Sequence, residues 1–148
     1  TGKHGFIDKT GRVVIPVKYS DAFRFIDGLA EVKIGDWKTG KRGFIDKTDK
    51  EIIPAKYDFT GIFYKGLVEV RIGDWETGKW GFIDKKGNAI TEFIYTGNGM
   101  FRDYPAFHEG LAAVKLNDKW GYIDDNARMT INFSFDPFPA DLLSSVCF

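Results

Sequence analysis

Apolar and polar residues alternate along several short stretches of this chain, and each stretch has the length of a β-strand. The pattern is clearest at residues 30–34, 68–72 and 112–116, where every second side chain is apolar and most of the others are charged. Such alternation is typical of a strand with one buried and one solvated face. We therefore predict an all-β, antiparallel fold in which the intervening charged residues, Glu31 and Glu69 among them, face water.

A second alternating segment, residues 79–84, runs directly into a tetrad with the composition of a tight turn. The tetrads Asp-Lys-Thr-Gly at 8–11 and Asp-Lys-Lys-Gly at 84–87 suit a type I turn followed by a bulge. In such a turn the aspartate accepts backbone N–H groups, and the glycine supplies a positive φ. We interpret these aspartates as turn caps, and we predict a looser turn where Ala127 takes the glycine position.

A third strand is predicted after each turn, at residues 13–15 and 52–53. Pro16 and Pro54 follow, and a proline removes a backbone donor, so we expect each strand to end there. About a dozen residues then lead to the next alternating strand. Each unit is thus predicted to be a three-stranded antiparallel meander, with this connection as its longest.

The same unit occurs about four times in tandem. Gly-aromatic-Ile-Asp recurs with spacings of 38, 38 and 40 residues, at 5–8, 43–46, 81–84 and 121–124. A fixed period of this length is the signature of a repeat architecture. We predict one domain over residues 1–148, made of repeats at about 1–38, 39–76, 77–116 and 117–148.

The repeats could form an open array or a closed, propeller-like ring. A ring would pair the last strand with the first, whereas an open array leaves two unpaired edges. We favour the open array, because four units of three short strands make a cramped ring. The chain begins at Thr1 without an initiator methionine, so we expect it to be a fragment of a longer protein.

Composition narrows the classes of partner. The 21 basic and 21 acidic residues cancel, so no overall field favours nucleic acid. Cys147 is the single cysteine, which excludes an internal disulfide. No apolar run approaches the roughly 18 residues of a membrane helix, so we expect no membrane insertion. The compartment stays open between cytoplasm, cell envelope and exterior.

The segments at 79–84 and 119–124, both of the form Lys-Trp-Gly-aromatic-Ile-Asp, resemble the signature of bacterial WG-repeat proteins. The Ile-Pro, Tyr and Phe-x-x-Gly-Leu-Ala-x-Val pattern over residues 15–32 is similar to the same family. His4 and Arg42 take the tryptophan position in the first two units. The resemblance implies an interaction or surface module, often one of several domains.

Two groups of aromatic residues lie outside the strand pattern. Trp37 and Trp75 occupy Gly-Asp-Trp-x-Thr-Gly links, where a tryptophan is not needed for the turn. The second group lies in an insertion in the third unit. Gly81 and Gly110 are 29 residues apart there, whereas the corresponding Gly43 and Gly66 of the second unit are 23 apart. For both groups packing on a neighbouring repeat is the favoured role and a partner surface is the alternative, whereas Trp80 and Trp120 are expected in the core. If the chain has a binding surface, we predict that Trp37, Trp75, Phe101, Arg102, Tyr104 and Phe107 form it.

The sequence lacks the motifs of common enzymes, and we expect neither catalysis nor a cofactor or metal. Its two histidines, His4 and His108, have no metal-ligand spacing, and no serine lies in a Gly-x-Ser-x-Gly context. We expect a protein-binding module, either the binding domain of a larger bacterial protein or an inhibitor of the immunity type. The alternative is a carbohydrate- or cell-wall-binding module with the loop tryptophans as stacking platforms. Co-planar exposed rings would favour sugar, and a mixed aromatic and cationic patch with a polar rim would favour protein.

Overall fold

The computed structural model describes residues 2–98 and 107–135, and within these ranges the chain forms strands and turns without a helix. The strands are β1 (His4–Ile7), β2 (Val13–Tyr19), β3 (Asp21–Ile26), β4 (Leu29–Ile34), β5 (Lys41–Ile45), β6 (Glu51–Tyr57), β7 (Phe59–Thr60), β8 (Leu67–Ile72), β9 (Lys79–Asp84), β10 (Gly97–Asn98), β11 (Phe107–His108), β12 (Leu111–Leu116), β13 (Lys119–Asp124) and β14 (Met129–Phe135).

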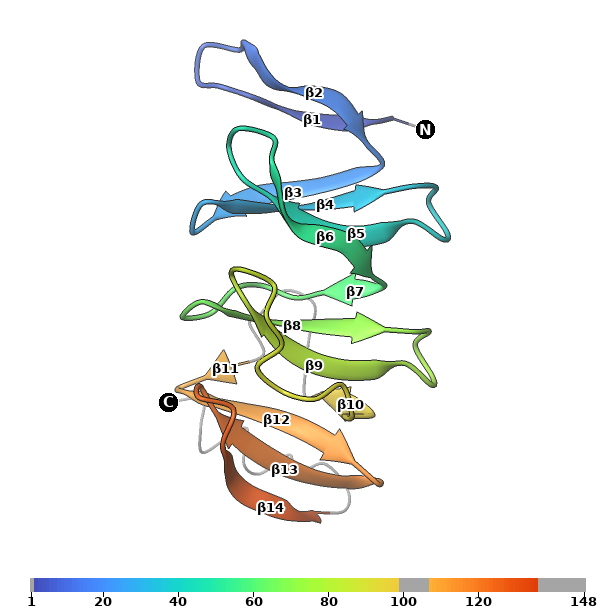
Figure 1. Cartoon of the computed structure of the whole chain (residues 1–148), viewed down its shortest axis with the longest axis vertical. Helices are drawn as coiled ribbons and strands as arrows, with labels where there is room; N and C mark the ends of the chain where they lie inside the picture. Colours follow the sequence, from blue (N-terminus) through green and yellow to red (C-terminus); the bar gives the residue numbers. More distant parts are fainter. Residues whose placement is uncertain (1, 99–106, 136–148) are drawn as a thin grey trace.

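These strands form four antiparallel sheets that follow one another along the chain. The first sheet pairs β1 with β2, the second has the order β3-β4-β5-β6, and the third has β7-β8-β9. The fourth contains β12-β13-β14, with β10 and β11 beside β12. The sheets stack along the long axis of the molecule, with the first and the fourth at opposite ends (Figure 1). The all-β open array is therefore confirmed.

The predicted meander is present, and the long connection adds a strand to it. Strand β4 pairs with β5, and β5 with β6, in the predicted antiparallel order. The connection after β2 contains β3, which pairs with β4, and the one after β6 contains β7, which pairs with β8. The register of β3 shifts between Ala22 and Phe25. This bulge breaks the alternation by which the strand could have been found in the sequence.

The prediction that a proline ends the third strand of each unit is wrong. β2 and β6 continue through Pro16 and Pro54 to Tyr19 and Tyr57. β6 lies at the edge of its sheet, and an edge strand tolerates proline because the missing donor faces away from the ladder. The register of β6 on β5 shifts at the same place, so the proline lies in a bulge.

The glycine of the Gly-aromatic-Ile-Asp motif allows this bulge to approach. A Cβ on Gly43 would lie 2.4 Å from the carbonyl oxygen of Ile53 and 2.7 Å from the nitrogen of Ala55. A Cβ on Gly121 would lie 2.7 Å from the carbonyl oxygen of Ile131 in the fourth sheet. The backbone of the neighbouring strand thus occupies the space that any larger residue would need.

Three hydrophobic cores lie between the four stacked sheets, so every internal sheet is buried on both faces. In β4, Ala30 and Val32 belong to the core toward the first sheet, while Leu29 belongs to the core toward the third. The prediction that the charged face of these strands is solvated is therefore wrong. Glu69 is 2% and Arg71 7% exposed, because the next sheet covers the face on which they lie.

The predicted aspartate-capped turns are confirmed. Asp46 Oδ1 accepts hydrogen bonds from the backbone nitrogens of Thr48 and Lys50, at 2.8 and 3.1 Å. Asp124 makes the same pair of bonds, at 2.9 and 2.8 Å, although Ala127 replaces the glycine and adopts a φ of 59°. The turn at Ala127 is no looser than the others, because its cap keeps the alanine in a left-handed conformation.

Candidate functional site

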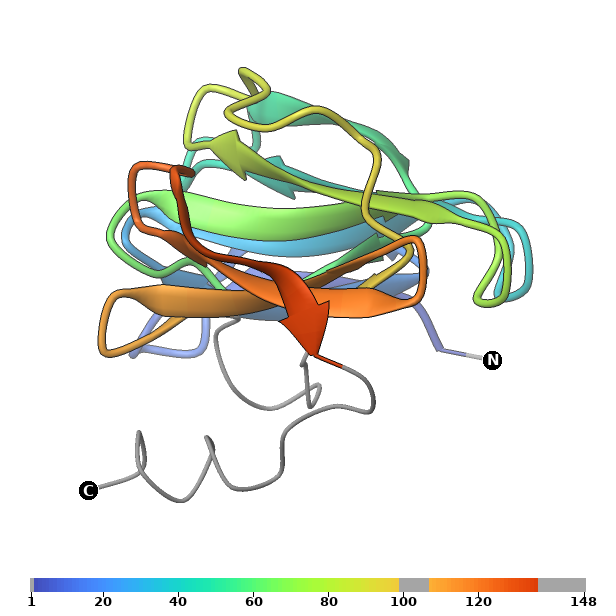
Figure 2. The same ribbon diagram turned by 90° about the horizontal axis from the view of Figure 1, so that it is seen from below.

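Two hairpin loops extend from the same end of the stacked strands. Residues 35–40 join β4 to β5, and residues 73–78 join β8 to β9; the two loops lie on one side of the molecule in both views (Figures 1 and 2). Their tryptophans, Trp37 and Trp75, are 73% and 72% exposed. The next hairpin has only Asn117 and Asp118 between β12 and β13, so it carries no third tryptophan. We call the two loops the tryptophan edge.

The same side-chain cap folds both loops. Asp36 Oδ1 accepts hydrogen bonds from the backbone nitrogens of Lys38 and Thr39, both at 2.7 Å. Asp74 Oδ1 accepts the corresponding bond from Thr77 at 2.7 Å. The threonine hydroxyl and backbone bonds hold the pKa of Asp36 below its ordinary value, so the cap is charged near neutral pH. Each tryptophan therefore occupies the same place in an equally folded loop.

A cation from the neighbouring strand lies against each exposed indole. Lys33 Nζ lies 5.1 Å from the centroid of the Trp37 ring and donates a hydrogen bond to the Trp37 carbonyl oxygen. The Arg71 guanidinium carbon lies 4.9 Å from the Trp75 centroid and 5.2 Å from that of Trp80. Cations so placed attract the aromatic ring and fix its orientation.

Trp75 is also braced by the core. Its ring stands edge-on to the buried Trp80, with centroids 6.1 Å apart and planes at 81°. Arg71 Nε donates a hydrogen bond to the carbonyl oxygen of Gly73, at 3.2 Å, which ties the guanidinium to the loop that carries Trp75. Trp80 and Arg71 thus hold the Trp75 indole in place, while most of its surface stays open to solvent.

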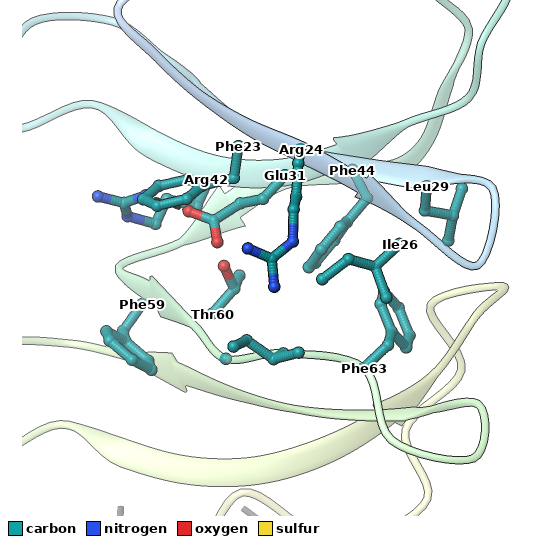
Figure 3. A pocket seen from close by; sticks show the side chains of 12 residues that line it. Phe23, Arg24, Ile26, Leu29, Glu31, Arg42, Phe44, Phe59, Thr60 and Phe63 are labelled. Carbon is teal, nitrogen blue, oxygen red and sulfur yellow. Dashed lines mark hydrogen bonds and ion pairs between the residues drawn. The ribbon is translucent and has the colours of Figure 1, made fainter. Parts of the chain in front are cut away.

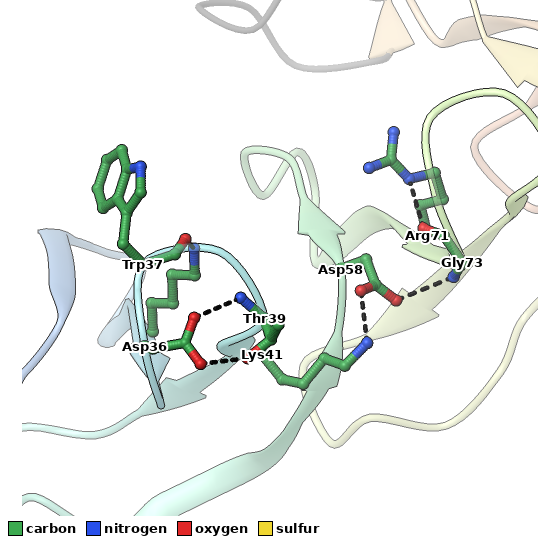
Figure 4. Close-up of polar contacts among 8 residues, drawn as sticks. Asp36, Trp37, Thr39, Lys41, Asp58, Arg71 and Gly73 are labelled. Carbon is green, nitrogen blue, oxygen red and sulfur yellow. Dashed lines mark hydrogen bonds and ion pairs between the residues drawn. The ribbon is translucent and has the colours of Figure 1, made fainter.

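Asp58, between β6 and β7, connects the two loops (Figure 4). It forms an ion pair with Lys41, which follows the first loop, and accepts a hydrogen bond from the nitrogen of Gly73 in the second, at 2.9 Å. Burial raises the pKa of Asp58, but the bonds from Lys41 and Gly73 outweigh it and bring the pKa below its ordinary value. One carboxylate thus joins the first loop, on the second sheet, to the second loop, on the third sheet.

The outcome differs among the six residues that were predicted to form a binding surface. Trp37 and Trp75 lie on the tryptophan edge, whereas Phe101, Arg102 and Tyr104 lie outside the described residues. Phe107 is wrong as a surface residue, because it is only 2% exposed. It belongs to β11, which pairs with β12, and its ring packs against Phe82 and Tyr64 at 5.1 and 5.9 Å between centroids.

A cavity of about 270 Å³ lies between the second and third sheets, and sequence reasoning missed it (Figure 3). We call it the inter-sheet cavity. Its walls are mainly apolar, and its polar side chains are Arg24, Glu31, Arg42 and Thr60. Burial raises the pKa of Glu31, although Arg42 and Thr60 oppose this shift. The signal available in the sequence was Arg42, which occupies the position that Trp80 and Trp120 hold in two other units.

Within the described residues, no three His, Cys, Asp or Glu side chains are placed to hold a metal ion. The same part of the chain contains no helix with the length and apolar character needed to cross a membrane.

One family model matches the chain. Its description is "WG containing repeat", and it matches residues 5–36, 43–74 and 80–120. Neither the comparison with curated proteins nor the one with solved structures found a match. Each matched segment contains strands of two neighbouring sheets, for example β1 to β4 in residues 5–36, and the third segment ends inside β13.

Proposed function

The chain belongs to the family of WG containing repeats, and on this premise we propose that it is a non-catalytic module that binds another protein through the tryptophan edge. Family membership supports a repeat-based module and leaves the partner open. The observation that carries the proposal is Trp75. Its indole is 72% exposed, yet it is braced by the nearly buried Arg71 and Trp80.

The chemistry of the edge suits a protein surface. Tryptophan and arginine are enriched among the residues that contribute most to protein–protein affinity. The indoles of Trp37 and Trp75 are already oriented by cations and capped loops, so binding costs little side-chain entropy. Charged residues of the same loops, Lys38 and Glu76 among them, are exposed next to the tryptophans in the sequence and can supply a polar rim. Aromatic centres with a polar rim are the usual composition of an interface.

Carbohydrate binding is the second candidate, because two exposed indoles one repeat apart could stack on sugar rings. The mixed composition of the edge weighs against it. Trp75 shares its cation with Trp80 and Phe59, so the exposed ring is part of an aromatic and cationic cluster and not an isolated platform. We therefore place protein first and glycan second.

The test compares the chain with a Trp37→Ala/Trp75→Ala variant. Each chain, the control included, is immobilised and incubated with soluble proteins of the cells that make the protein. Each is also applied to a glycan array. Val13→Ala/Val17→Ala is the matched control, since both valines are 62% exposed but lie on the first sheet. We expect proteins that the wild type and the control retain and the tryptophan variant loses. Glycan binding that depends on the tryptophans would favour the second candidate, and equal capture by all three chains would refute both.

A further inference from the structure

The inter-sheet cavity exists where this chain departs from its own repeat. In the third unit Trp80 fills the space beside Phe59, with ring centroids 5.3 Å apart. Arg42 occupies the corresponding position of the second unit, 38 residues earlier, and lines the cavity instead. A flexible arginine drawn toward carboxylates does not occupy the volume of an indole, so an open space remains between the sheets.

A bulge in β3 directs two consecutive side chains to this cavity. Ala22 pairs with Val32 and Phe25 with Ala30, so Phe23 and Arg24 together stand opposite Glu31 alone. Neighbouring residues of a regular strand point to opposite faces, whereas a bulge re-aims them. Both Phe23 and Arg24 line the cavity as a result. Bulges of this kind are over-represented beside binding and active sites.

The charges in the cavity leave one cation available. Arg42 forms ion pairs with both Glu31 and Asp21, and its side chain is 11% exposed. The Arg24 guanidinium makes no ion pair or hydrogen bond with any part of the chain that the structure describes. It extends into the space between Thr60 and Phe44 (Figure 3). Arg24 can therefore accept an anionic partner without giving up one among the described residues.

Size and wall chemistry limit what can enter. The volume of about 270 Å³ is just below the usual range of small-molecule sites, about 300–1,000 Å³. Leu29, Phe44 and Phe63 form a buried apolar floor, and the rings of Phe44 and Phe63 lie edge to face with centroids 4.9 Å apart. An occupant needs an apolar body of about the size of one aromatic side chain.

We propose that the inter-sheet cavity binds a monocarboxylic acid with a single aromatic or branched apolar group, whose carboxylate pairs with Arg24. The apolar group lies on Leu29, Phe44 and Phe63, and the guanidinium offers the bidentate geometry that carboxylates favour. This site is independent of the tryptophan edge, because it lies between the sheets and not on the hairpin loops.

The test is titration of the isotopically labelled chain with 3-phenylpropionate, followed by amide chemical shifts. The neutral 3-phenylpropionamide has the same body without the charge. We expect the acid to perturb residues of β3, β4 and the 59–63 segment and to bind about tenfold or more tightly than the amide, since a hydrogen bond to a charged group is typically worth 1.5–3 kcal/mol. N-acetylglycylphenylalanine carries the same phenyl group and carboxylate at its free C-terminus. Comparing its affinity with that of 3-phenylpropionate distinguishes a small acid from a peptide C-terminus as the occupant.

The variant Arg24→Met keeps the length of the side chain and removes its charge at an exposed position, so folding is retained. We expect it to lose the preference for acid over amide, whereas Arg12→Met, at another exposed arginine in the first turn, keeps it. The Trp37→Ala/Trp75→Ala variant should bind the acid unchanged. Equal affinity for acid and amide in the wild type, unchanged acid binding in Arg24→Met, or shifts confined to other sheets would overturn the proposal.

Discussion

Tryptophans of this chain differ in role according to their place in the repeat. Trp80 lies in β9, is 4% exposed and packs against Phe59 between two sheets. Trp37 and Trp75 lie in hairpin loops and are more than 70% exposed. The alternating pattern of the strand correctly predicted a buried Trp80, whereas Trp120, also expected in the core, is half-buried.

The first prediction concerns the core role of Trp80. We expect Trp80→Ala to lower the free energy of unfolding by about 3–5 kcal/mol, the usual cost of removing a large buried aromatic side chain. His4→Ala is the matched change at the same repeat position, and His4 is exposed in the first sheet. Chemical denaturation measures both. A larger loss for His4→Ala would contradict the assignment of the core.

At the scale of the element, the turn after β13 is strained. Ala127 adopts a φ of 59°, a conformation that costs a non-glycine residue about 1–2 kcal/mol. We expect Ala127→Gly to raise the free energy of unfolding by about 1 kcal/mol, because glycine relieves the strain and the cap of Asp124 is kept. Gly11→Ala reverses the change in the first turn, where φ is 83°, and is expected to destabilise the chain. A stability loss in Ala127→Gly would show that the turn is not strained.

The contacts of Asp58 make the free energy of unfolding depend on pH. Its pKa is lower in the folded chain than its ordinary value of 3.8, so its ties to Lys41 and Gly73 stabilise the fold above that pH. The contribution is lost as pH falls through the lowered pKa, because the protonated acid no longer attracts Lys41. We expect Asp58→Asn to cost about 1 kcal/mol at pH 6 and progressively less below pH 4. Denaturation of both chains between pH 6 and pH 2.5 measures the difference, and a constant difference would contradict the tie.

Elements were predictable from the sequence where their side chains alternate. β4, β8 and β12 and their partners β5, β9 and β13 lie where the pattern indicates. β3 was missed because its bulge at Phe23 and Arg24 interrupts the alternation. The inter-sheet cavity was missed for a related reason. Alternation indicates that a strand has two faces, but it does not indicate that a second sheet covers the polar one and leaves Glu31 only partly exposed.

At the scale of the whole molecule, each internal sheet is stabilised by two neighbours and each terminal sheet by one. The outer face of the first sheet leaves Ile7 66% and Val17 62% exposed, whereas Ile45, one repeat later, is 1% exposed. In a linear array, stability is close to a sum of repeat and neighbour terms. The first sheet is therefore expected to be less stable than the second and the third, which have two neighbours each.

Hydrogen exchange tests this order of stability. We expect amides of β4, β5, β8 and β9 to exchange with the free energy of global unfolding, and those of β1 and β2 to exchange faster through local opening. The expected difference follows from the single interface of the first sheet. Uniform protection across all four sheets would indicate one cooperative unit and would contradict the additive description of the array.

The central claim is that the tryptophan edge is the binding surface, and affinity for a captured protein tests it most directly. Calorimetry with that protein is to be run on the wild type, Trp37→Ala, Trp75→Ala and the double variant, with Val13→Ala/Val17→Ala as the control. We predict that each single change costs about 2 kcal/mol or more, roughly thirtyfold in Kd, while the control binds as the wild type does. Wild-type affinity in the double variant would contradict the claim.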